Sequence, residues 1–164
     1  MKKVFTKMDL RWGYNNVRIK EGDEWKVVFT ILERSFELTV MFFGLTNSPA
    51  MFQVMINELL RDLINIGKIA TFINNVIVGT EMEERHDEIV AEVIKRLEEN
   101  DLYMKLEKCK WKVREVGFLG VVIGPDGIKM VKVKVKGVLE WPTPKCAKDI
   151  QKFLGLANYY RQFI

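Results

Sequence analysis

Residue types that build disulfide frameworks and zinc sites are scarce in this chain. It has two cysteines and one histidine in 164 residues, too few for either kind of structure, so we expect Cys109 and Cys146 to be free thiols. No apolar run approaches the roughly 20 residues that a membrane-spanning helix requires. The first residues lead into a strand-like segment rather than a signal-peptide core. We therefore expect an intracellular protein without membrane contact, in a compartment that the sequence does not specify.

What is present suits one globular domain, because 48% of the residues are hydrophobic and 29% are charged. The formal net charge of +4 and the pI of ≈ 9.0 suit a polyanionic partner, although many proteins of this charge bind none. Basic side chains gather in two stretches, residues 105–114 and 129–136. These stretches are either contacts for nucleic acid or solvated faces, and composition does not decide between the two.

Hydrophobic periodicity predicts strands and helices that do not alternate strictly. Segments rich in β-branched and aromatic residues predict strands over residues 4–10, 25–32, 35–43, 103–106 and 116–123. Helical spacing predicts helices over residues 48–67, 82–100 and 150–160, the last one after a break at 141–144. Turns are expected at Glu33-Arg34, at Pro125-Asp126-Gly127 and, within a hairpin over residues 69–78, at Asn74-Asn75. This order favours an α+β fold with helices packed on one face of a sheet.

Several short blocks occur in one order along the chain: Val4–Leu10 followed by Gly13-Tyr14, Phe43–Ala50 followed by Phe52-Gln53, Phe72–Asn75, Leu106–Cys109, Phe118–Gly120 and Phe153–Ile164. The first ends a strand at an aspartate, and the second is a glycine turn that opens a helix. In this order and spacing, the blocks resemble the reverse transcriptases of Ty3/gypsy-type long-terminal-repeat retrotransposons. The resemblance covers almost the whole chain, and no single block would carry it alone.

The resemblance implies a polymerase palm, which is a ferredoxin-like antiparallel sheet with helices on one face. Residues 1–130 would form the palm with part of the fingers at about residues 15–45, and residues 131–164 would begin the thumb. It also implies a primer-template of RNA or DNA, deoxynucleoside triphosphates, and Mg²⁺ or Mn²⁺ ions. For residues 131–136 it implies a short helix, whereas the alternation of valine and lysine predicts a strand. We favour the helix.

The resemblance also implies roles for single residues. The catalytic positions would be Asp9, Asn74 and Asn75. The nucleotide-binding residues would be Tyr14, Phe43, Gly44, Gln53 and Lys108. The primer grip would be formed by Phe118, Leu119 and Gly120.

Some of these residues have simpler interpretations when the resemblance is set aside. Tyr14 and Phe43 would be buried core residues, since lone aromatic residues beside strands usually are. Lys108 would be a solvated surface charge, because it lies in a basic stretch. Gly44 is better supported, because a glycine between a strand and a helix permits close approach of the backbone to a ligand.

The pair Asn74-Asn75 stands where the family has two aspartates. An asparagine offers a neutral amide oxygen in place of a carboxylate, whereas magnesium prefers anionic oxygens. Asp9 alone would hold one metal ion weakly at best, so we expect Mg²⁺ or Mn²⁺ not to be bound tightly and polymerase activity to be lost. Asparagine also tolerates the left-handed backbone of a two-residue turn, and that interpretation is compatible with the same fold.

The alternative function is a non-catalytic domain that binds nucleic acid or a protein partner through its basic face and exposed apolar surfaces. Surfaces that the missing fingers and thumb would cover favour self-association, because exposed apolar patches and sheet edges attract partners. In that interpretation we expect a homodimer. Salt-dependent binding to a primer-template duplex would instead indicate that nucleic-acid recognition is retained.

Overall fold

Five antiparallel strands form the largest sheet in residues 2–163, the part of the chain that the computed structural model describes. The strands of this sheet are β1 (Val4–Arg11), β4 (Ile69–Phe72), β5 (Asn75–Thr80), β6 (Tyr103–Met104) and β7 (Lys110–Val113). β1 lies between β5 on one side and β6 with β7 on the other. Its register with β5 runs from Val4 opposite Thr80 to Asp9 opposite Asn75. Two of the predicted catalytic positions, far apart in sequence, therefore face each other across neighbouring strands.

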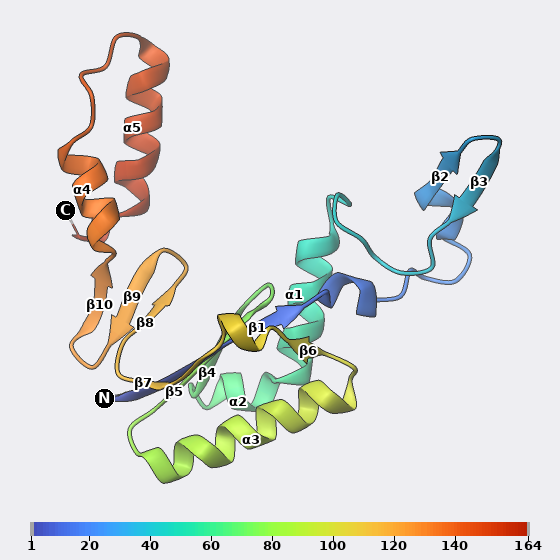
Figure 1. The fold of residues 1–164 in the computed structure, drawn as a ribbon, viewed down its shortest axis with the longest axis horizontal. Coiled ribbons are helices and arrows are strands. Elements are labelled where there is room, and N and C mark those ends of the chain that lie inside the picture. Colours follow the sequence, from blue (N-terminus) through green and yellow to red (C-terminus); the bar gives the residue numbers. More distant parts are fainter. Residues whose placement is uncertain (1, 164) are drawn as a thin grey trace.

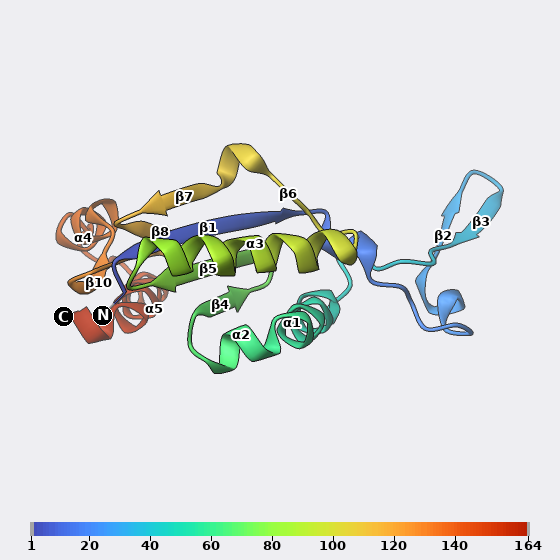
Figure 2. The same ribbon diagram turned by 90° about the horizontal axis from the view of Figure 1, so that it is seen from below.

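The helices α1 (Ser48–Leu59), α2 (Arg61–Asn65) and α3 (Glu83–Glu99) cover one face of this sheet (Figure 1 and Figure 2). Every second side chain of β1 points toward them, because strand side chains alternate between faces. Met8 and Leu10 accordingly pack with Phe52 of α1 and Val93 of α3 in a core that excludes solvent. Pro49 lies in the first turn of α1, where its missing amide would have no helical partner. This arrangement confirms the predicted α+β fold.

The opposite face carries a smaller core, in which Phe5 and Ile77 pack with Val116 and Phe118. The last two residues belong to a separate sheet of β8 (Val116–Phe118), β9 (Val121–Gly124) and β10 (Gly127–Met130). The prediction of one strand over residues 116–123 is wrong, because the chain turns at Leu119-Gly120, where both residues have positive φ. Two consecutive positive φ values are typical of a two-residue hairpin turn, and glycine adopts them without steric cost.

The segment expected to hold part of the fingers projects from the sheet as a hairpin (Figure 1). In it, the 3-10 helix η2 (Glu24–Val27) precedes β2 (Val28–Ile31), which pairs with β3 (Arg34–Glu37). The strands predicted over residues 25–32 and 35–43 are therefore too long, and the turn lies at Leu32-Glu33 rather than at Glu33-Arg34. Every residue of β2 and β3 is exposed, so no packing extends their pairing.

Helix predictions were more accurate than strand predictions in the middle of the chain. α3 confirms the helix predicted over residues 82–100, whereas the helix predicted over residues 48–67 is interrupted at Leu60, whose backbone is not helical. Two further 3-10 helices are η1 (Gly13–Asn16) and η3 (Leu106–Lys108). η3 ends the strand predicted over residues 103–106 early. β7 was not predicted, although Trp111 and Val113 alternate with two lysines in a pattern that suits a strand.

The C-terminal part contains α4 (Lys132–Leu139), α5 (Ala147–Tyr159) and the 3-10 helix η4 (Arg161–Phe163). The helix favoured at residues 131–136 is confirmed. The valine and lysine alternation there forms no strand, because these side chains lie in no sheet that would bury one face. Trp141, in the break before α5, packs on Phe153 with ring centroids 5.7 Å apart. No helix among the described residues is long and apolar enough to span a membrane.

Candidate active site

Asp9, Asn74 and Asn75 meet at the end of β1, as the family resemblance implies. The amide of Leu10 donates a hydrogen bond of 2.7 Å to the carbonyl of Asn74, which holds the hairpin against β1. The Asn74 Nδ2 lies 3.4 Å from the Asp9 Oδ1, and the Asn75 Nδ2 donates to the Asn74 Oδ1 at 3.0 Å. All three side chains are half-buried. They form one polar chain in which the carboxylate of Asp9 is the single charged group.

The hairpin between β4 and β5 turns at Ile73-Asn74, one residue earlier than predicted. Ile73 has φ 51, a left-handed conformation that is strained for a β-branched residue and persists only where its surroundings hold it. Gln53 of α1 supplies that support, because its Oε1 accepts a 2.6 Å hydrogen bond from the Ile73 amide. The Gln53 Nε2 donates to Thr71 and to Asn57. Gln53 therefore positions the turn that carries Asn74.

A cavity of ≈ 330 Å³ opens beside Asn74. Tyr14 stands in its wall between two rings, with centroids 4.8 Å from Phe43 and 5.5 Å from Phe52 and edge-to-face geometry in both cases. Gly13 makes this packing possible, because a Cβ there would lie 2.2 Å from the Phe52 ring. The remaining residues that line the cavity are Leu10, Trp12, Ile73, Asn74 and Lys105.

Trp12 and Lys105 are site residues that the sequence reasoning missed. Trp12 lies between the two parts of the first block, Val4–Leu10 and Gly13-Tyr14, and this position was the signal that could have pointed to it. Lys105 begins the basic stretch of residues 105–114, but that stretch did not single it out; it comes to the cavity because its amide donates a 2.8 Å hydrogen bond to the carbonyl of Asp9. Arg11 places its guanidinium carbon 4.2 Å from the centre of the Trp12 ring, a favourable cation–π contact.

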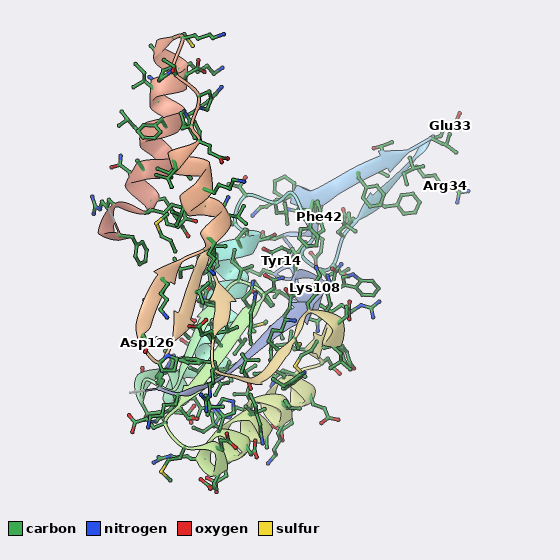
Figure 3. The ribbon with its side chains drawn as sticks, turned by 60° about the vertical axis from the view of Figure 1, so that its left-hand side comes forward. Tyr14, Glu33, Arg34, Phe42, Lys108 and Asp126 are labelled. Carbon is green, nitrogen blue, oxygen red and sulfur yellow. The ribbon has the colours of Figure 1, made fainter. Side chains whose placement is uncertain are left out.

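Not every predicted nucleotide-binding residue lines the cavity. Lys108 is exposed in η3, at the same end of the sheet as Tyr14 (Figure 3), and it is not part of the cavity wall. Gly44 lies in an exposed turn with φ 113 and open space around it. Phe43, in contrast, lines the cavity and touches Tyr14, although it is 74% exposed. The roles of these three residues stay predictions.

The predicted primer-grip residues Phe118, Leu119 and Gly120 lie apart from the cavity, at the turn between β8 and β9. α5 holds this turn through two tyrosines. The Tyr159 hydroxyl donates to the Leu119 carbonyl at 2.5 Å, and the Tyr160 hydroxyl donates to the Gly120 carbonyl at 3.1 Å. Because Tyr160 is buried at 2% exposure, the turn and the C-terminal helix form one packed unit.

The donor set at Asp9 does not fit a pair of divalent ions. It offers one carboxylate and two neutral amides, whereas Mg²⁺ requires several hard, anionic oxygens close together. Within residues 2–163 no group of three or more histidine, cysteine, aspartate or glutamate side chains could hold a metal ion. The neighbour of the Asp9 carboxylate is the neutral amide of Asn74, which adds no negative charge for a cation.

Comparison with known proteins places this site in a family. The model of the family described as "Reverse transcriptase (RNA-dependent DNA polymerase)" matches residues 1–123. The chain belongs to the reverse transcriptase family. The Pol polyprotein of the Drosophila melanogaster transposon opus is 37% identical over 163 residues, which is 99% of this chain and 16% of that relative. The Schizosaccharomyces pombe transposon Tf2-7 polyprotein is 32% identical over 98% of this chain and 12% of its own length.

Solved reverse transcriptase structures agree with this assignment. A foamy viral protease-reverse transcriptase in complex with double-stranded DNA matches with a TM-score of 0.86 and 28% identity, over 97% of this chain and 28% of that protein. A foamy viral protease-reverse transcriptase with an RNA/DNA hybrid matches with a TM-score of 0.82 and 28% identity, over 97% and 21%. The resemblance to retrotransposon reverse transcriptases and the palm-like fold are confirmed. This reverse transcriptase segment spans less than a third of each of these relatives.

Proposed function

We propose that this segment is the palm of a retrotransposon reverse transcriptase and that it does not catalyse nucleotide addition in this form. Residues 1–130 would be the palm with part of the fingers, and residues 131–164 the start of the thumb. The observation that carries the proposal is the polar chain of Asp9, Asn74 and Asn75, which retains one carboxylate. DNA synthesis by polymerases of this class depends on divalent ions held by carboxylates, which stabilise the attacking and leaving oxygens.

Loss of the metal ions would leave the surrounding palm intact. Asparagine and aspartate have the same shape, so Asn74 and Asn75 keep the hairpin and its pairing with β1 while removing two negative charges. Gln53 and the aromatic wall, which position the hairpin and shape the cavity, contain no ionised group. The fold and the metal chemistry are therefore separable in this protein.

A primer-extension assay tests the proposal. The chain is incubated with an annealed primer-template and the four deoxynucleoside triphosphates, first with Mg²⁺ and then with Mn²⁺. We expect no extended primer with either ion. Extension that depends on Asp9, and is abolished by Asp9→Asn, would show that one carboxylate is sufficient and would refute the proposal.

Binding of nucleic acid without catalysis is supported by exposed lysines of α4, namely Lys132, Lys134 and Lys136. The foamy viral relatives were solved with an RNA/DNA hybrid and with double-stranded DNA. Replacing these three lysines by glutamine should weaken binding of a fluorescent duplex. The slope of its salt dependence should fall by about one unit for each phosphate that a lysine no longer neutralises. A triple variant with unchanged affinity and slope would exclude α4 as the binding surface.

Self-association is a second candidate, supported by the hairpin of β2 and β3. Phe29 and Phe36 stack across it with centroids 5.6 Å apart, yet they remain 40% and 46% exposed, and Leu32 at the tip is 96% exposed. A two-stranded hairpin is marginally stable alone, so a covering surface would stabilise it. We expect a homodimer by light scattering that Phe36→Ser disrupts and that Ile66→Ser, an exposed apolar control on another element, leaves intact. A monomeric mass at high concentration would contradict this candidate.

A further inference from the structure

Two side-chain hydroxyls of this chain directly precede a proline, in Ser48-Pro49 and in Thr143-Pro144. A hydroxyl residue followed by proline is the pattern that proline-directed protein kinases recognise, and the sequence gives no reason to prefer either pair. The structure separates them. Ser48 is 1% exposed in the first turn of α1, and its Oγ donates a 3.2 Å hydrogen bond to the Phe42 carbonyl. A kinase could not reach this hydroxyl in the folded protein.

Thr143, in contrast, is exposed in the connection between α4 and α5 (Figure 1). No helix or strand includes residues 141–145. Pro142 and Pro144 have a fixed φ, and a proline disfavours the helical conformation of the residue before it, so the segment around Thr143 stays extended. None of the hydrogen bonds of the described residues involves the Thr143 hydroxyl. This hydroxyl is therefore accessible and has no partner to give up.

The surroundings of Thr143 suit a phosphoryl group. A cavity of ≈ 410 Å³ beside it is lined by Trp141, Pro142, Thr143, Lys145, Asp149 and Lys152. The Lys152 Nζ lies 3.5 Å from the Asp149 carboxylate, whereas Lys145 takes part in no ion pair within residues 2–163. A lysine ammonium group binds phosphate as a point charge and needs no particular ligand geometry. Lys145 can therefore pair with a phosphate on Thr143.

We infer that Thr143 is a phosphorylation site for a proline-directed protein kinase and that its modification weakens binding of nucleic acid. In the transfer, the Thr143 Oγ forms a bond to the γ-phosphorus of ATP. The bond between that phosphorus and the oxygen that bridges to the β-phosphate breaks, and ADP leaves. The hydroxyl proton passes to a carboxylate of the kinase. The site shares no residue with the candidate active site around Asp9.

The effect on binding follows from the charge of the modified side chain. Phosphothreonine carries a charge of about −1.5 to −2 at pH 7, which outweighs the excess of Lys145 and Lys152 over Asp149 in the cavity wall. α4, whose lysines are the proposed binding surface, ends at Leu139, just before this segment. Like charges repel, so a duplex should bind about twofold to fivefold more weakly at low salt, where screening is least. This part rests on the proposed binding by α4.

Mass spectrometry of the whole chain tests the modification. The chain is incubated with ATP, Mg²⁺ and a proline-directed kinase of the cyclin-dependent class, and the product is mapped by peptide. We expect one phosphate per chain, on Thr143, and none on Ser48. Thr143→Val, which keeps the side-chain shape without the hydroxyl, should take up no phosphate. Pro144→Ala keeps the hydroxyl and should largely prevent the transfer, because it removes the proline that the kinase recognises.

An unmodified product, phosphate on Ser48 instead, or equal transfer to Pro144→Ala would each overturn the inference. Titration with a fluorescent duplex then compares the phosphorylated chain with kinase-treated Thr143→Val. We expect weaker binding by the phosphorylated chain, a difference that shrinks as salt is added and disappears after phosphatase treatment. Equal affinities would overturn the regulatory part. Failure of the unmodified chain to bind any duplex would refute the proposed nucleic-acid binding, whereas the mass spectrum would still decide whether Thr143 is a kinase site.

Discussion

Acid should destabilise this protein through a single buried imidazole. His86 of α3 is fully buried between two threonines, with its Nε2 2.7 Å from the Thr6 Oγ1 and its Nδ1 2.9 Å from the Thr80 Oγ1. The Thr80 hydroxyl donates to the Met82 carbonyl, and the Thr6 hydroxyl accepts from the Lys112 amide. These partners leave Nδ1 as the donor and Nε2 as the acceptor, so every group is satisfied by the neutral ring.

Protonation of His86 would break this pattern. Nε2 would become a donor that faces the Thr6 hydroxyl, whose own proton would lose its acceptor. Burial lowers the pKa of His86 below its ordinary value of 6.5, with Lys112 lowering it further and with Asp87 and Glu83 acting in the opposite direction. The unfolded chain therefore binds a proton that the folded chain does not, and the free energy of unfolding falls as the pH drops below about 6.5 toward the folded-state pKa.

The size of the effect follows from the hydrogen bonds. A buried polar group that loses its partner costs about 1–3 kcal/mol. One group whose ordinary pKa is 6.5 can contribute at most about 2 kcal/mol between about pH 8 and about pH 5, so unfolding by urea should require about 1–2 kcal/mol less free energy at the lower pH. His86 is the one histidine of the chain, and in His86→Gln the fall over this range should shrink accordingly. An equal fall in both proteins, followed by circular dichroism, would refute the role of His86.

Three substitutions give further predictions. Gly13→Ala should cost about 1–3 kcal/mol in urea unfolding, because its Cβ must displace the Phe52 ring 2.2 Å away; unchanged stability would show that the ring yields freely. Tyr160→Phe should cost about 0.5–1.5 kcal/mol, since it removes the hydrogen bond to the Gly120 carbonyl, and faster amide exchange of that turn should accompany it. Gln53→Leu should cost about 1–3 kcal/mol by leaving the turn amide without its acceptor; a neutral effect in thermal unfolding would contradict its positioning role.

Strongly periodic segments were predictable from the sequence, because their apolar residues fall on one face that packs against the rest of the protein. α3 follows from its apolar stripe, which packs on the sheet. The helix at residues 131–136 was correct only through the family resemblance, since its alternating sequence indicates a strand when taken alone. The predicted strands around β2 and β3 were too long, because residues with high strand propensity continue beyond the last residues that pair in the hairpin.

The site was predictable as a set of positions but not as a cavity. Asp9, Asn74 and Tyr14 belong to sequence blocks that resemble the family's motifs, and the structure brings these three residues together. The basic stretch that contains Lys105 was visible in the sequence, but the position of Lys105 in the cavity was not, because it depends on a backbone hydrogen bond between segments that are distant in sequence. Lys108 was favoured instead, since the block in which it lies was the available guide. Lys105 lines the cavity and Lys108 does not. This difference depends on the tertiary structure rather than on the local sequence.

Calorimetric titration of manganese into the chain and into its Asn74→Asp, Asn75→Asp variant tests the central proposal most directly, because it needs neither template nor primer. We predict no binding by the chain and clear binding by the variant, in which three carboxylates would meet at the end of β1. Equal manganese affinity of both proteins would show that the amides suffice, and it would contradict the loss of metal-dependent chemistry.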